Sequence, residues 1–138
     1  MSINQTFAVA MHSMCVIAVS DPEAVSAVYI GEQISVHPVV VRRTLVRLVD
    51  ANFLKSYAGS KGGYALSVPA AKISLHDVFK AMQETGAFGG KHGMPHSSCE
   101  EGLLVEGVLN DIYKQVDESL ARVLKKITLA QVIKRAIV

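Results

Sequence analysis

The sequence predicts a mainly α-helical fold with one small β-hairpin. Apolar residues recur every three or four positions along much of the 138-residue chain, as they do on one face of a helix. A glycine-rich turn at residues 58–63 separates two short segments of β-compatible composition. Half of the residues are hydrophobic, but only 6% are aromatic and none is Trp. Aliphatic side chains must therefore build the core of what is one domain's length of chain.

Two helices are expected in the N-terminal part of the chain. The first covers residues 3–19 and ends at Asp21-Pro22. Its apolar positions are Ile3, Phe7, Met11, Met14 and Ala18. The second helix spans residues 23–34 and is expected to turn Val25, Val28 and Tyr29 inward.

A third helix and the hairpin follow. After a tight connector at residues 35–37, Pro38 opens a helix that runs to about Ala51, because the missing proline N–H costs nothing at a first helical position. One face of this helix, with Val41, Leu45 and Leu48, is expected to pack on the first two helices. The opposite face carries Val39, Arg43, Val46, Arg47 and Asp50, with Val40 at the side. Residues 54–57 and 64–68 are the expected strands.

The C-terminal half contains a short helix, a loop, a long helix and a last helix. Ser74 and Asp77 form a capping box that opens a helix with the apolar stripe Leu75, Val78, Phe79 and Met82. Residues 85–98 are expected to form a loop. The long helix, residues 99–127, has an apolar seam with near coiled-coil spacing, made of Val105, Leu109, Ile112, Val116, Leu120, Val123 and Ile127. Thr128-Leu-Ala-Gln131 is a second capping box. The chain is thus divided into a head of residues 1–84, the loop, and a helical region of residues 99–138.

The order helix, helix, tight turn, helix and glycine-tipped hairpin is that of a winged helix-turn-helix. An outward face of valines followed by arginines suits the major groove of DNA, where methyl groups meet thymine and arginine binds guanine or phosphate. Lys61 at the hairpin tip would add a phosphate or minor-groove contact, and Gly62 and Gly63 would let the backbone approach closely. The alternative is an ordinary three-helix core with surface arginines.

Charge is arranged in blocks of alternating sign. Within a total of +2, residues 37–64 carry +4, residues 99–118 carry −5 and residues 119–138 carry +5. The first basic block contains Arg42, Arg43, Arg47, Lys55 and Lys61, and it is the candidate for binding a polyanion. Its alternative is a solvated charged face.

Several stretches make the chain similar to a known family. Residues 34–48 read ISVHPVVVRRTLVRL, residues 59–66 read GSKGGYAL, and residues 73–78 read ISLHDV. Over essentially its whole length the chain resembles the Rrf-two-type bacterial transcriptional regulators, the family of IscR, NsrR and CymR. The PVVVRR variant, AVAMH at residues 8–12 and ITLAQV at residues 127–132 are most similar to its cluster-free, YwnA-like branch.

The resemblance implies a homodimer, held by the long helix, that binds a near-palindromic operator in double-stranded DNA, as a repressor does. Each protomer would place its third helix in a major groove and its wing in the neighbouring minor groove. The DNA-binding candidates are Ser35, His37, Pro38, Val39, Val40, Arg42, Arg43, Arg47, Ser60, Lys61, Gly62, Gly63 and Tyr64. One departure is Ala58, where wings of the family often carry arginine, so that Lys61 would replace it only as a point charge.

The two cysteines bear on cofactor and signal. Cluster-binding members of the family carry three cysteines in the second half of the chain, whereas this chain has only Cys99 there, which implies no iron–sulfur cluster. A cluster or metal that recruits His92, His96 or a partner thiol is the alternative, and these two histidines could share a helix face with Cys99. At the predicted start of the long helix, Cys99 is the candidate redox sensor, against the alternative of a passive cysteine. Cys15 is expected to be a small core hydrophobe.

Other classes of protein are disfavoured. A thiol peroxidase using Cys99 would need a base and an oxyanion site, and neither stands at recognisable spacing, so we predict no enzyme and no catalytic residues. A winged-helix module that binds protein instead of DNA would show weak, salt-insensitive DNA affinity. A pocket for a small molecule between the head and the long helix is conceivable, but no residue pattern marks it.

The remaining expectations concern location and histidines. Residues 1–20 carry no Asp, Glu, Lys or Arg, but there is no basic start and polar residues interrupt the apolar run, which argues against a signal peptide or a membrane span. We therefore expect a cytoplasmic protein with no membrane partner. His12 is expected to lie in the core and His76 at the surface.

Overall fold

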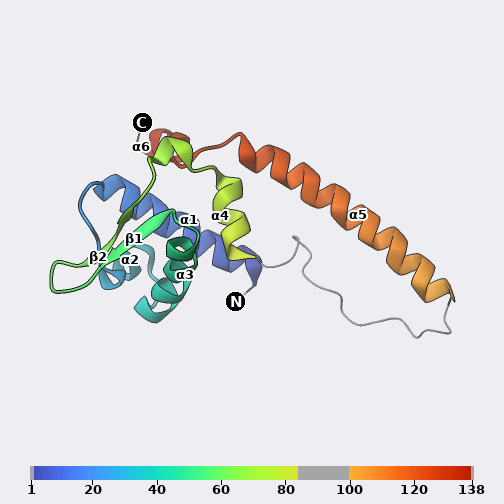
Figure 1. Ribbon diagram of the computed structural model, residues 1–138, viewed down its shortest axis with the longest axis horizontal. Helices are drawn as coiled ribbons and strands as arrows, with labels where there is room; N and C mark the ends of the chain where they lie inside the picture. Colours follow the sequence, from blue (N-terminus) through green and yellow to red (C-terminus); the bar gives the residue numbers. More distant parts are fainter. Residues whose placement is uncertain (1, 84–99, 138) are drawn as a thin grey trace.

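The computed structural model describes residues 2–83 and 100–137 and has the predicted mainly helical fold with one hairpin. In chain order its elements are α1 (Ile3–Ser20), α2 (Ala27–Ile34), α3 (Pro38–Asp50), β1 (Leu54–Tyr57), β2 (Gly63–Leu66), η1 (Ala70–Lys72), α4 (Leu75–Met82), α5 (Glu100–Lys125) and α6 (Leu129–Ile137). A head contains α1–α4, the hairpin and α6, while α5 extends away from it (Figure 1). No helix of the described part is long and apolar enough to cross a membrane.

Helix α1 is the central helix of the head. Ser2 caps it, because the Ser2 hydroxyl accepts the Gln5 N–H and the Gln5 side chain accepts the Ser2 N–H. Its inner face buries Ala10, Met14 and Ile17 against α2, α3, α4 and α6. His12 lies on the exposed side of this helix, so the expectation of a core histidine is wrong.

Helix α2 begins four residues later than predicted. Val25 is held in extended conformation by an antiparallel bridge, in which its N–H and C=O bond to the backbone of Tyr64 at 3.0 and 2.8 Å. Ser26 then caps the helix by accepting the Tyr29 N–H. This later start changes the buried face: Val28 and Tyr29 are 46% and 44% exposed, against the expectation. The buried residues are Ala27, Ile30 and Gly31.

The hairpin pairs Leu54 with Leu66 at its base and Tyr57 with Gly63 near its turn. Leu54 and Ala65 turn inward and are buried. The second strand ends at Leu66 and not at Val68, because Ser67 leaves the ladder and bonds to the backbone carbonyls of Phe53 and Asn52.

The last helix completes the core of the head. The capping boxes of Ser74 and Thr128 both form as predicted, and an antiparallel bridge joins these two residues. Leu129 is fully buried in the main core cluster, so the predicted head of residues 1–84 is completed by α6. Ile127 lies beyond the end of α5, and its carbonyl accepts the Leu75 N–H. It therefore does not belong to the helical seam to which we assigned it.

Candidate nucleic-acid interface

The turn between α2 and α3 is tightly built. Ser35 adopts a left-handed conformation with φ 57°, and the Val36 N–H bonds back to the Gly31 carbonyl. His37 caps α3, since its Nδ1 accepts the Val39 N–H at 3.2 Å. A Cβ atom on Gly31 would overlap the Val36 carbonyl oxygen. Sequence reasoning missed this glycine, whose signal is its place three residues before the end of α2.

The two faces of α3 separate as the sequence predicts. Val41, Leu45 and Leu48 are completely buried and pack in the core. Thr44 is buried beside them, and its hydroxyl donates a hydrogen bond to the Val40 carbonyl. The opposite face is in solvent. Its exposed residues are Val39, Arg42, Arg43, Val46, Arg47 and Asp50, and the two valines are about half exposed at 48% and 51%. An outward helix face of this composition can contact base edges and phosphates.

Arg47 has an intramolecular role that the sequence did not indicate. Its Nη1 donates a hydrogen bond to the carbonyl oxygen of Met82, the last residue of α4, at 2.8 Å. Since a guanidinium group has several further N–H donors, Arg47 can still contact a phosphate, but its position is set by α4. Arg42 and Arg43 are the exposed arginines nearer the start of α3.

The wing presents Ser60 and Lys61 to solvent. Its turn is closed by the Gly62 N–H bonding to the Gly59 carbonyl at 3.0 Å. Gly62 and Gly63 have internal roles: a Cβ on Gly62 would overlap the Tyr57 carbonyl, and one on Gly63 would overlap the backbone of Val25.

Two further residues of the hairpin, Tyr64 and Lys55, differ in their exposure to solvent. Tyr64 pairs with Ser56 in the hairpin, is half-buried and packs against the core, and its contact with DNA stays a prediction. Lys55, by contrast, was counted in the basic block but not assigned to the interface. It is exposed on β1, with its Nζ 5.8 Å from the Tyr57 ring centroid. Helices α2 and α3 and the hairpin lie at one end of the head, away from the far end of α5 (Figure 1).

Helix α5 carries an uncovered apolar stripe along one side. Four members of the predicted seam are exposed, namely Val105, Ile112, Val116 and Val123, and Leu104 and Val108 extend the same side. Leu109 and Leu120 are half-buried. The other side of α5 faces α4 through residues such as Asp117 and Ala121, so the stripe points away from the head.

The thiol of Cys15 is a poor candidate for a ligand of an iron–sulfur cluster. His92, His96 and Cys99 lie outside the described residues. Cys15 is half-buried in the middle of α1, packed against the core as predicted, and burial raises the pKa of its thiol. Because an iron–sulfur cluster needs thiolates, and the chain has two cysteines in all, a three-thiolate cluster does not fit one protomer.

Comparisons with known proteins identify the family. The model of the Rrf2 family, described as an iron-dependent transcriptional regulator, matches residues 3–135. The chain therefore belongs to the Rrf2 family of transcriptional regulators, as the motifs indicated, and it is not an enzyme.

Individual relatives agree with this assignment. YwnA of Bacillus subtilis (strain 168), named as an HTH-type transcriptional regulator, is 31% identical over 118 residues, which is 86% of each chain. The structure named T. potens IscR is 23% identical with a TM-score of 0.71, covering 95% of this chain and 85% of the other. Staphylococcus aureus CymR is 20% identical with a TM-score of 0.67, covering 94% and 95%. The last two similarities show the shared winged-helix fold.

Proposed function

We propose that this transcriptional regulator is a homodimeric repressor that binds a near-palindromic operator through α3 and the wing. The observation that carries the proposal is the division of α3. Its apolar side is fully buried, and the opposite side presents two exposed valines among exposed arginines. A helix that is only a surface element needs no such valines, whereas a helix in the major groove can place them against thymine methyl groups.

The wing supports the same arrangement. Lys61 at its tip and Lys55 on its strand are exposed, as are Arg42 and Arg43 on α3. A surface with these four cations binds DNA by releasing counterions, and its affinity must fall steeply with salt. Arg42, Arg43 and Lys61 are the predicted contacts whose role depends most on charge.

The experiment is fluorescence anisotropy with DNA from upstream of the protein's own gene, over a series of salt concentrations. Arg43→Ala is expected to weaken binding by about 1–3 kcal/mol if Arg43 reads a base, and to lower the salt slope by about one if it contacts a phosphate. Arg135→Ala, an exposed arginine at the end of α6, is the matched control and should bind as the wild type does. Unchanged affinity in Arg43→Ala, or weak binding without salt dependence, would instead favour a protein-interaction module.

The dimer rests on α5. An apolar stripe from Leu104 to Val123 spans most of a 26-residue helix and points away from the head. A second copy of the same stripe is the partner that completes it with two-fold symmetry, as in a coiled-coil seam. Two heads related by this axis would reach two half-sites about one helical turn of DNA apart.

The signal is proposed to act through Cys99, and this part rests on the sequence because Cys99 lies outside the described residues. Operator binding by reduced protein, mildly oxidised protein and Cys99→Ser tests it. Release of DNA by oxidation in the wild type but not in Cys99→Ser supports a thiol switch. Equal binding by all three removes Cys99 as the sensor and leaves the DNA-binding proposal intact. We further propose that this regulator carries no iron–sulfur cluster and acts on chromosomal DNA in the cytoplasm.

A further inference from the structure

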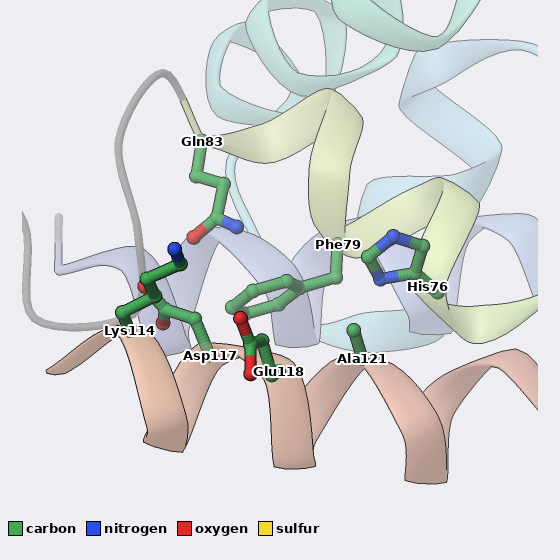
Figure 2. A pocket seen from close by; sticks show the side chains of 7 residues that line it. All are labelled: His76, Phe79, Gln83, Lys114, Asp117, Glu118 and Ala121. Carbon is green, nitrogen blue, oxygen red and sulfur yellow. The ribbon is translucent and has the colours of Figure 1, made fainter. Parts of the chain in front are cut away.

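A cavity of about 340 Å³ lies between the head and the long helix. Helix α4 and the residue after it line one side with His76, Phe79 and Gln83, and α5 lines the other with Lys114, Glu118 and Ala121. Figure 2 shows the Phe79 ring between the two helices, with the Gln83 side chain reaching toward α5. This volume lies at the lower end of the range for small-molecule sites, and it suits a molecule of amino-acid size.

Two buried polar atoms of the lining have no hydrogen-bond partner among the described residues. They are Nδ1 of His76 and Oε1 of Gln83. His76 was expected at the surface, but it is half-buried with this nitrogen turned away from solvent. Both atoms are closed to solvent in this conformation, so a ligand that draws these side chains toward it supplies hydrogen-bond partners that the protein alone does not.

The chemistry of the lining selects the ligand. Glu118 places a carboxylate at the cavity, beside the ammonium of Lys114, and Asp117 is a further lining residue. The Gln83 carbonyl oxygen and the face of the Phe79 ring also attract positive charge. The ring is fixed in place by an edge-to-face contact with Phe7 of α1, with centroids 5.3 Å apart. A compound with a primary ammonium group and an apolar body meets all of these groups, and a carboxylate on the same compound would meet Lys114.

We propose that this cavity is a regulatory site for a small amine-bearing metabolite, either a cation or a zwitterion. The regulatory part rests on the proposed DNA-binding function. Gln83, which lines the cavity, directly follows Met82, and the Met82 carbonyl holds the Arg47 side chain of α3 at 2.8 Å. A ligand that draws Gln83 toward α5 moves the group that positions Arg47 on the DNA-binding helix. The two sites therefore share one hydrogen-bonded connection, and by reciprocity DNA must alter ligand affinity by the same factor.

Binding is tested first, on the full chain without DNA, by isothermal titration calorimetry. The probes are 2-phenylethylamine, L-phenylalanine and 3-phenylpropionate, which share one apolar body and differ in the amine and the carboxylate. The two amines are expected to bind at millimolar concentration and the acid is not. Glu118→Gln is expected to weaken 2-phenylethylamine about tenfold, because it removes a charge-assisted hydrogen bond.

The matched control is Asp111→Asn, which removes the same charge from an exposed position of α5 outside the cavity lining. It should bind 2-phenylethylamine as the wild type does. The site is overturned if the acid binds as well as the amines, if none of the three binds, or if Glu118→Gln and Asp111→Asn behave alike. Equal melting temperatures of the two variants show that both remain folded.

Coupling is tested by operator anisotropy with and without saturating 2-phenylethylamine. The amine is expected to change operator affinity by about fivefold or more in the wild type, the lower end of usual coupling. In Ala121→Leu, which places a larger side chain in the cavity, the effect of the amine should be weaker. If the amine binds but operator affinity stays the same, the coupling is wrong and the site stands. If no operator is bound in any condition, the proposed function fails, and the calorimetry still decides the site.

Discussion

The Arg47 guanidinium group and the Met82 carbonyl oxygen join the exposed face of α3 to the C-terminus of α4 through a hydrogen bond of 2.8 Å. The last carbonyls of a helix have no partner within the helix, and a cationic donor at this end also complements the helix dipole. Gln83 is extended and ends α4 without a glycine cap. Arg47 therefore satisfies a carbonyl that the local sequence leaves open.

Two substitutions of Arg47 distinguish the contribution of its hydrogen bond to Met82 from that of its positive charge. Arg47→Ala is expected to lower the free energy of unfolding by about 1 kcal/mol, since it removes one partly exposed hydrogen bond between two helices. Arg47→Lys keeps the charge but loses the planar donor group, so it should recover little of this loss. Urea denaturation measures both. Arg43→Ala, on the same helix, should stay within about 0.5 kcal/mol of the wild type, and equal losses in Arg43→Ala and Arg47→Ala would contradict the prediction.

Gly63 is expected to be the most sensitive glycine of the hairpin. Its φ of 142° is rare for other residues, and a Cβ atom would overlap the Val25 backbone. We expect Gly63→Ala to cost about 3 kcal/mol in the free energy of unfolding, the upper end for backbone strain. Gly107→Ala is the control, because Gly107 lies within α5 with open space around it. It should gain about 0.8 kcal/mol from helix propensity, and a similar loss in both variants would refute the argument.

A charge in the apolar stripe is expected to dissociate the dimer. Ile112→Glu places a carboxylate at the centre of the stripe, where a partner stripe would bury it without a counter-charge. Asn110→Glu makes the same addition at an exposed position on the other side of the helix. Analytical ultracentrifugation should find monomers for Ile112→Glu and dimers for Asn110→Glu. Should Ile112→Glu sediment as a dimer, the seam assignment is wrong.

Ser13 places an unsatisfied hydroxyl group in the core. Its side chain is fully buried in α1, and its hydroxyl oxygen has no hydrogen-bond partner among the described residues. Ser13→Ala removes an unsatisfied polar group at little change in volume, so we expect a gain of about 1 kcal/mol in the free energy of unfolding. Thermal and urea denaturation measure it. A loss of similar size would mean that the hydroxyl has a bonding role.

Cys15 should be poorly reactive in the folded protein. Burial raises the pKa of its thiol, so that near neutral pH the folded state holds even less of the reactive thiolate than an unfolded chain does. In Cys99→Ser, where Cys15 is the remaining thiol, we expect alkylation by iodoacetamide to be slow at pH 7. The alkylation rate should rise only at pH values above the ordinary pKa of a thiol. Mass spectrometry follows the reaction, with the urea-unfolded variant as control, and equal rates in the two states would contradict the prediction.

Local patterns predicted most of the fold. The capping boxes at Ser74 and Thr128, the proline at the start of α3 and the glycine-rich turn are short-range signals, and each marks the expected element boundary. The division of α3 followed from helical periodicity alone, because its apolar residues leave only one side to bury.

Long-range contacts account for the misplaced residues. Helix α2 starts late because Val25 pairs with Tyr64, a residue 39 positions away in the chain that no local pattern connects to it. The same bridge brings the Val25 backbone against Gly63, so that a side chain at this position would overlap it. The sequence left open a pocket between the head and the long helix but marked none of its residues, since His76 and Glu118 come together only through the packing of α4 on α5. Arg47 looks like its neighbour Arg43 in sequence, and only the position of Met82 distinguishes them.

The chain returns to the head after α5, through the bridge between Ser74 and Thr128 and the burial of Leu129. The long helix therefore belongs to the same folding unit as the head, because the chain before it and the chain after it pack in one core. A protease that cuts once within α5 would leave two fragments that remain associated through Leu129. A gene truncated before residue 128 would instead yield a head with a hole where Leu129 packs, and such a fragment is a poor substitute for the intact DNA-binding unit.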